Sequence, residues 1–185
     1  FQTGVVKYAA NTLLPLYSSQ TIEFFVKLDA PPQQWAGIVR CNRSTTITDP
    51  TWAFGFADAN GQINLRFDIN VNGEIVRDRS KGAINGGTDK YIRDHRWHHL
   101  ALAFEPKEEG GTKATLWLDY CENPYVVETS GDMVWEDGKA PIWLGQTGAS
   151  PSFIGKIDEL RISKGVLNPS EFLRVEPSGT MILFR

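Results

Sequence analysis

The strongest constraint on the fold of this chain is an alternation of apolar and polar residues with a period of two. In residues 21–29 the apolar side chains occupy every second position, at Ile22, Phe24, Val26 and Leu28. Successive side chains of a β-strand point to opposite faces, so this pattern predicts a strand with one buried face. The same alternation recurs along the chain, and the sequence therefore predicts an all-β protein.

The clearest local feature is a hairpin. Aromatic and small residues alternate over 52–57, apolar and polar residues alternate over 62–69, and residues 58–61 form a turn between them. A second turn at residues 72–73 combines Asn and Gly, which suit a left-handed backbone, and leads to a third strand over 74–77. We therefore predict a three-stranded meander.

The rest of the chain predicts further strands and one short helix near the C-terminus. The helix is expected over residues 169–173, because Asn168 is a cap residue, Pro169 follows it, and Glu171 lies three residues after the cap. The further strands are predicted at residues 97–104, 114–120, 125–128, 142–145, 153–163 and 180–184.

Composition sets the scale of the protein and excludes two classes of function. With 185 residues, 41% of them apolar, the chain is expected to form a single domain over residues 1–185. A net charge of −3 argues against nucleic-acid binding. No apolar stretch approaches the roughly 20 residues that span a bilayer. The chain begins at Phe1, so we expect it to be excised from a larger protein with neighbouring domains.

Strand length and side-chain size favour one β architecture. Long antiparallel strands with one polar face indicate two stacked sheets, and faces rich in Phe, Trp, Ile and Leu are too bulky to line the cavity of a closed barrel. The chain is also too long for a seven-stranded immunoglobulin-like module. The sequence predicts a two-sheet antiparallel jelly-roll sandwich.

Residues 94–104, Asp-His-Arg-Trp-His-His-Leu-Ala-Leu-Ala-Phe, resemble the Trp-His-His-Val-Ala strand of laminin G-like domains in the concanavalin A-like lectin and glucanase superfamily. Residues 21–28, 114–119 and 153–163 resemble the early, hairpin and closing strands of that family. The order and spacing agree from about residue 5 onward. One departure is the sequence Asp-Tyr-Cys-Glu at 119–122, where the family has an Asp-Gly turn.

The resemblance implies a concanavalin A-like fold and a mostly noncatalytic role. Such domains are modules of secreted or surface proteins that bind glycans or proteins, or that brace a neighbouring domain. We therefore expect an extracellular, cell-surface or periplasmic location. Fold alone does not decide function, so each candidate site needs its own chemical argument.

A polar strand of the predicted hairpin is the best candidate for a binding surface. Asn64, Arg66 and Asp68 lie on one side of their strand, and the small residues of 53–57 lie opposite if the register follows the turn. That arrangement predicts a shallow groove. The alternative is a solvated face that loops cross.

Sugars are bound by planar donors and acceptors together with an aromatic platform. Trp117 and Phe25 are aromatic residues at outward positions of their strands, and Asp119 lies on the same side as Trp117. We expect these three residues to complete the ligand site. Burial of either ring by a loop is the alternative.

Asp158 and the two cysteines leave structural questions open. Asp158 is expected on a largely apolar face with Leu160 and Ile162, where a carboxylate needs partners. The resemblance implies a structural calcium ion with Asp158 as a ligand, whereas backbone amides or an arginine are the alternative partners. Cys41 and Cys121 are either bonded to each other or two buried thiols.

Signals for catalysis are weak. A retaining glycosidase needs two carboxylates about 5 to 5.5 Å apart, and no pair of acids in this sequence has the required spacing on one strand face. His98 and His99 are adjacent and face opposite ways on a strand, so they cannot act together. The leading hypothesis is a noncatalytic carbohydrate-binding or adhesion module of an exported protein, with a glycan or glycan-bearing protein as partner. The alternatives are a glycoside hydrolase or polysaccharide lyase, and a bracing module without sugar affinity.

Overall fold

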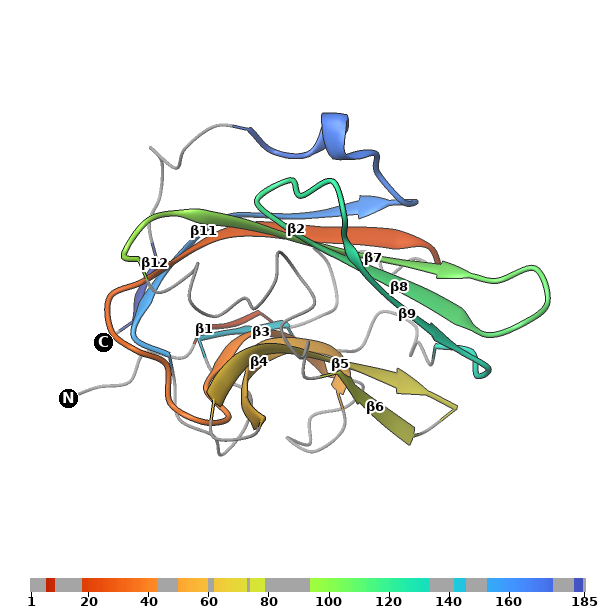
Figure 1. Cartoon of the computed structure of the whole chain (residues 1–185), viewed down its shortest axis with the longest axis horizontal. Helices are drawn as coiled ribbons and strands as arrows, with labels where there is room; N and C mark the ends of the chain where they lie inside the picture. The colour runs from red at the N-terminus through yellow and green to blue at the C-terminus, as the bar shows by residue number, and fades with distance from the viewer. Residues whose placement is uncertain are drawn as a thin grey trace.

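In the part of the chain that the structure describes, the strands form two antiparallel sheets of six strands each, stacked as two layers (Figure 1). Sheet A has the order β1-β10-β3-β4-β5-β6 and sheet B has the order β12-β11-β2-β7-β8-β9. The predicted all-β sandwich is confirmed. This computed structural model describes residues 6–8, 18–42, 50–59, 62–72, 74–78, 94–133, 142–145, 153–174 and 182–184.

The bounds of ten of the twelve described strands agree closely with the periodicity of the sequence, the exceptions being β1 and β3. Sheet A contains β1 (Val6–Tyr8), β3 (Gly37–Asn42), β4 (Pro50–Ala59), β5 (Gln62–Val71), β6 (Glu74–Asp78) and β10 (Ile142–Leu144). Sheet B contains β2 (Gln20–Leu28), β7 (His98–Pro106), β8 (Thr112–Leu118), β9 (Tyr125–Thr129), β11 (Gly155–Lys164) and β12 (Ile182–Phe184).

The apolar faces of the two sheets meet in one core. Phe24 of sheet B packs edge to face on Phe54 of sheet A, with 5.2 Å between ring centroids. Burial of apolar surface is the main favourable term in folding, and edge-to-face aromatic pairs add to it. The largest fully buried side chains are Trp52, Phe24, Phe54, Phe56, Phe67, Phe104 and Phe153.

The predicted meander is confirmed, since β4, β5 and β6 are neighbours in sheet A. Asn72 has a φ of 51°, the left-handed conformation expected at the turn between β5 and β6. The next strand, β7, leaves sheet A and lies between β2 and β8 in sheet B. Consecutive segments are therefore divided between the two layers.

The periodicity did not predict β1 or β3. In β3 the register with β4 shifts between Gly37 and Val39, and the adjacent residues Ile38 and Val39 are both fully buried. A bulge of this kind places two apolar residues in succession and interrupts the alternation. β1 has three residues, too few to show a period.

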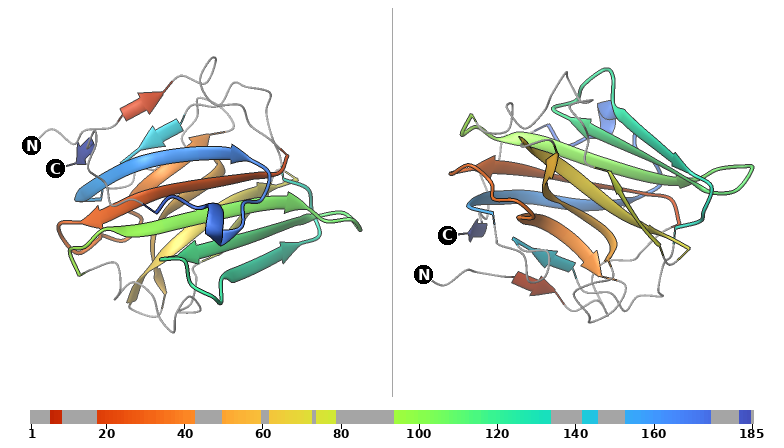
Figure 2. Two further views of the ribbon diagram at one scale, coloured as in Figure 1. Left: turned by 90° about the horizontal axis from the view of Figure 1, so that it is seen from above. Right: turned by 60° about the horizontal axis from the view of Figure 1, so that its bottom comes forward.

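The predicted helix is present but shorter than expected. It is a 3-10 helix, η1 (Pro169–Glu171), and it begins with the predicted cap, because the Asn168 N–H donates to Glu171 Oε2 at 2.8 Å. It does not continue to Leu173, because the N–H of that residue donates to Glu23 at 2.9 Å. η1 lies over the outer face of sheet B, as Figure 1 and the left view of Figure 2 show.

The cysteine question is answered in favour of thiols. Cys41 on β3 and Cys121 after β8 are both buried and unbonded. Burial raises the pKa of the Cys41 thiol to about 12. Among the described residues, no helix has the length and apolar character needed to cross a bilayer.

Candidate functional site

The register that the hairpin turn predicted is confirmed. Asp68 on β5 lies opposite Ala53 on β4, and Arg66 lies opposite Gly55. Arg66 and Asp68 therefore share the outer face of sheet A, as expected. Asn64 is on the same strand, opposite Ala57, and its side chain is outside the described part of the structure.

Two more strands extend this outer face. Arg40 on β3 lies opposite Ala53, and Trp143 on β10 lies opposite Arg40. Trp143, Arg40, Ala53 and Asp68 thus form one row across four strands. Sequence reasoning missed Arg40 because the bulge hid β3. Its alternation with the apolar residues Val39 and Cys41 is the one signal that could have found it.

Arg66 and Asp68 form a buried ion pair on this face. Arg66 Nη2 lies 3.1 Å from Asp68 Oδ2, and the side chains are 8% and 6% exposed. The guanidinium also lies over the ring of Trp35, 4.8 Å from the ring centroid. A guanidinium over an indole face is a favourable cation–π contact. Trp35, Arg66 and Asp68 together place an aromatic ring beside a charged pair that can form hydrogen bonds.

Trp35 has an unusual backbone conformation. Its φ is 66°, a region that bulky residues adopt only when the surroundings require it. Trp35 is the third residue of a turn that is closed by a bond from the Ala36 N–H to the Gln33 carbonyl at 3.1 Å. Trp35 is half-buried, while Gln33 and Gln34 are exposed. Solvent therefore reaches the candidate site at Trp35.

The expected open groove above the small residues of β4 is not there at Gly55. A Cβ atom on Gly55 would lie 2.7 Å from the carbonyl oxygen of Ala36. That carbonyl accepts a bond from the Phe56 N–H at 2.8 Å, so the backbone of the Trp35 turn fills the space above Gly55. The expectation of an open groove was wrong at this position, whereas Trp35 at the rim of the face is half-buried.

The expectation that Trp117 and Phe25 share a surface with Arg66 was also wrong. Arg66 belongs to sheet A, whereas Trp117 is on β8 and Phe25 on β2 of sheet B. Outward residues of the two sheets point to opposite sides of the sandwich. Trp117 is 7% exposed and packs on Phe172, with ring centroids 5.3 Å apart. Phe25 is 5% exposed, so neither ring is an open platform.

Asp119 follows β8 instead of continuing it, since its φ is 49°. It accepts a bond from the His99 N–H at 2.9 Å, and its other oxygen is 2.6 Å from His98 Nδ1. The second ring nitrogen of His98 is 2.8 Å from Asp94. Burial alone would lower the pKa of His98, but the hydrogen bonds to Asp119 and Asp94 outweigh burial and raise it. Asp119 thus anchors the start of β7.

Asp158 is on the outer face of sheet B and not on the apolar face. It lies opposite Phe25, and the register shifts by one residue before Arg161. The bulge places Leu160 and Ile162 against the core, so the expected shared face was wrong. Asp158 Oδ1 accepts a bond from the Glu159 N–H at 2.9 Å. Among the described residues, no group of three or more His, Cys, Asp and Glu side chains is arranged to hold a metal ion, and a calcium ion at Asp158 stays a prediction.

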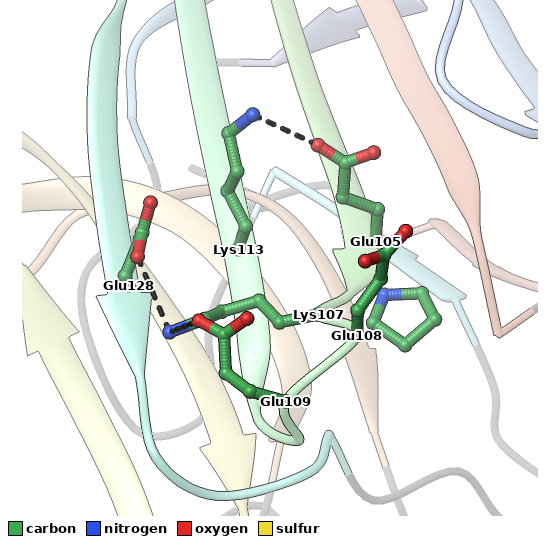
Figure 3. Close-up of a pocket in the computed structure, with 7 residues that line it drawn as sticks. Glu105, Lys107, Glu108, Glu109, Lys113 and Glu128 are labelled. Carbon is green, nitrogen blue, oxygen red and sulfur yellow. Dashed lines mark ion pairs between the residues drawn. The ribbon is translucent and has the colours of Figure 1, made fainter.

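A charged crevice of about 240 Å³ lies where β7 and β8 meet their connecting turn (Figure 3). Lys107 lies 3.2 Å from Glu128 and 3.3 Å from Glu109, and Lys113 lies 3.0 Å from Glu105. The hydrogen bond from Lys107 lowers the pKa of Glu109. The general acid of a glycosidase needs a raised pKa, so Glu109 is unsuited to that role.

The comparisons with known proteins agree with the fold. A family profile for the concanavalin A-like lectin/glucanases superfamily matches residues 2–172. The chain belongs to this superfamily, and the resemblance noted in the sequence is confirmed. No curated protein sequence matched.

Solved structures with this fold include binding proteins and an enzyme. A heptameric SAP-like pentraxin from Limulus polyphemus has a TM-score of 0.56 at 14% identity, with 89% of this chain and 78% of that chain covered. The Ruminococcus gnavus IT-sialidase CBM40 bound to α2,6-sialyllactose has a TM-score of 0.56 at 13% identity, covering 83% and 80%. An endo-β-1,4-glucuronan lyase from the fungus Trichoderma reesei has a TM-score of 0.50 at 16% identity, covering 80% and 65%.

Proposed function

We propose that this chain is a noncatalytic carbohydrate-binding module that binds its ligand at the Trp35 rim of the outer face of sheet A. One observation carries the proposal. Trp35 is half-buried, has a left-handed backbone, and its indole lies against the guanidinium of the buried Arg66–Asp68 pair. Sugar rings stack their C–H faces on an aromatic plane, and their hydroxyl groups bond to planar charged groups beside it.

Two further observations support this assignment. The exposed amide-bearing residues Gln33 and Gln34 precede Trp35 and can supply both donors and acceptors. A fold neighbour, the CBM40 module, was solved with a sialylated sugar. As part of the same proposal, the chain is a module of an exported protein with neighbouring domains.

A glycan array followed by affinity electrophoresis tests the proposal. The array should contain neutral, sialylated and uronate-containing glycans. We expect the wild type to bind at least one glycan class, and Trp35→Ala to weaken that binding about tenfold or more, since tryptophans dominate binding energy where they are the platform.

The matched control is Val126→Ala. Val126 is 43% exposed on β9 in sheet B, so its loss should leave binding unchanged. A wild type that binds no glycan on the array, or a Trp35→Ala variant that is folded and binds as well as the wild type, refutes the proposal.

A further inference from the structure

The outer face of sheet B is occupied by the chain itself. Residues 165–174, here called the covering segment, cross this face after β11 (Figure 2). Their first contact is with Thr21, which is fully buried. Its hydroxyl donates to the Gly165 carbonyl at 2.9 Å and accepts from the Leu167 N–H at 2.9 Å. One side chain of β2 thus binds both a carbonyl and an amide of the covering segment.

Three more side chains bind the backbone of the same segment. Glu23 accepts the N–H of Leu173 at 2.9 Å, and Tyr120 donates to the carbonyl of Leu173 at 2.5 Å. Arg161 Nη2 donates to the carbonyl of Glu171 at 2.7 Å. Proteins that bind extended peptides obtain affinity in this way, from bonds to main-chain groups.

Specificity for a peptide comes from pockets that accept individual side chains. In the covering segment Phe172 is buried, and Leu167 is half-buried against the core. Phe172 is 3% exposed, and its ring packs on His99 at 5.5 Å and on Trp117 at 5.3 Å between centroids. Val166 and Ser170 are exposed. The face therefore recognises a peptide backbone and a single aromatic side chain.

We infer that the outer face of sheet B is a peptide-binding groove occupied in cis by the covering segment, and that it accepts the same segment from a second copy of the chain. Gly165, where the segment leaves β11, has a φ of 82°, and no atom lies within 4 Å of a Cβ placed there. The Gly165 N–H donates to the Ser19 carbonyl at 2.8 Å, so Gly165 stays bound beside β2 and a change in direction of the segment begins at the exposed Val166. The groove is on the opposite side of the sandwich from Trp35, so it is independent of the proposed glycan site.

The experiment uses the full chain and a fluorescent synthetic peptide with the sequence of residues 165–174. In the wild type the covering segment competes with the peptide. Phe172→Ala weakens the contact between the covering segment and the face, and it leaves the added peptide unchanged. A larger fraction of the protein then has its face uncovered, so the apparent affinity for the peptide rises. We expect fluorescence anisotropy to show the peptide binding Phe172→Ala about a hundredfold or more tightly than the wild type, given the cost of removing a buried Phe.

Two controls define the anchor. Ser170→Ala, at an exposed position, should bind the peptide as the wild type does. A peptide with Ala in place of the anchoring Phe should not bind Phe172→Ala. Absence of peptide binding to a folded Phe172→Ala chain, or equal binding of the two peptides, overturns the inference.

A second variant covers the case in which Phe172→Ala does not fold. Leu173→Pro removes the N–H that donates to Glu23 and keeps the anchor, and the extended backbone of Phe172 at φ −65°, ψ 154° suits the residue before a proline. We expect this variant to bind the peptide about tenfold more tightly than the wild type, in line with one lost hydrogen bond to a charged group. Unchanged binding in a folded Leu173→Pro chain contradicts the inference as well.

Discussion

Replacement of Glu23 by glutamine tests the interaction that joins β2, β7, β11 and the covering segment. The Glu23 side chain is fully buried, and its carboxylate accepts bonds from His99 Nε2 at 2.8 Å, Arg161 Nε at 2.6 Å and the Leu173 N–H at 2.9 Å. Glutamine has almost the same shape but one acceptor oxygen and no charge. The variant therefore loses the ion pair and leaves part of the donor set unsatisfied.

The expected cost follows from the environment of each partner. Removing one member of a buried ion pair costs about 3 to 5 kcal/mol. The Arg161 side chain is 37% exposed, so water solvates part of its guanidinium after the change. We therefore expect the lower end, about 3 kcal/mol in the free energy of unfolding, which for a domain of this size lowers Tm by about 6 to 12 °C.

Urea denaturation followed by tryptophan fluorescence measures this loss. The midpoint should fall while the slope of the unfolding free energy against urea stays constant, since the surface exposed on unfolding is unchanged. Glu105→Gln is the matched control, because Glu105 pairs with Lys113 at 3.0 Å but is 37% exposed. That change should cost less than about 0.5 kcal/mol.

The dependence on pH provides a second readout for Glu23. Burial alone would raise its pKa, but the hydrogen bonds from His99, Leu173 and Arg161 outweigh burial and hold it below the ordinary value of 4.5. A depressed pKa contributes stability above the unfolded-state pKa and loses it as the pH falls through the folded-state pKa. Wild type and variant should therefore converge in stability below pH 4.5. A loss below about 1 kcal/mol at neutral pH would refute the reasoning.

Three further predictions concern single groups. Two hydrogen-bonded aspartates raise the pKa of His98 above 6.5 despite burial, so His98 should contribute stability that is lost as the pH rises through its folded-state pKa. NMR titration of His98 and urea melts of the wild type and His98→Gln measure this contribution. An NMR titration midpoint below 6.5 would contradict the prediction. Gly111→Ala should lower the free energy of unfolding by at least about 2 kcal/mol more than Gly110→Ala, as measured in urea melts. Both glycines have positive φ, but only at Gly111 would a Cβ lie 2.1 Å from the Thr129 carbonyl oxygen. Equal losses in the two variants would count against this packing. Burial and a pKa of about 12 predict that Cys41 reacts with Ellman's reagent only as the chain unfolds, with both thiols reacting in denaturant; rapid reaction of Cys41 in the native state is the opposing result.

Local features of the fold were predictable from the sequence. Alternation over residues 21–29 predicted β2 within one residue at each end. The turn between β4 and β5 fixed the hairpin register, so the shared face of Arg66 and Asp68 followed from residues close in sequence.

The division of strands between the two sheets was not predictable in the same way. β7 and β8 are joined by a short turn, but whether their hairpin lies beside β2 or in sheet A depends on contacts between distant segments, and no local pattern in residues 98–118 records it. Trp117 and Arg66 were assigned to one surface for this reason. Trp35 was missed because it lies in a turn, where no strand period indicates the direction of a side chain.

The covering segment also exceeded what the sequence could predict. Its cap identified a short helix at Pro169, but nothing in the residues indicated that Phe172 would pack on Trp117. An outward aromatic residue has the same alternation pattern whether it is open to solvent or covered by a distant part of the chain.

The extra residue at the β11 bulge determines which side chain reaches Glu23. Counting back from the pairing of Asp158 with Phe25, an uninterrupted strand would place Leu160 opposite Glu23, whereas the observed partner is Arg161. Pairing these residues without the bulge would therefore exchange a guanidinium for an aliphatic side chain beside a fully buried carboxylate, whereas deletion of Glu159 itself would remove the bulge and keep Arg161 opposite Glu23. A one-residue insertion or deletion inside a strand is usually harmful because it moves the following side chains to the opposite face. Here the extra residue at the bulge is what places Arg161 opposite Glu23.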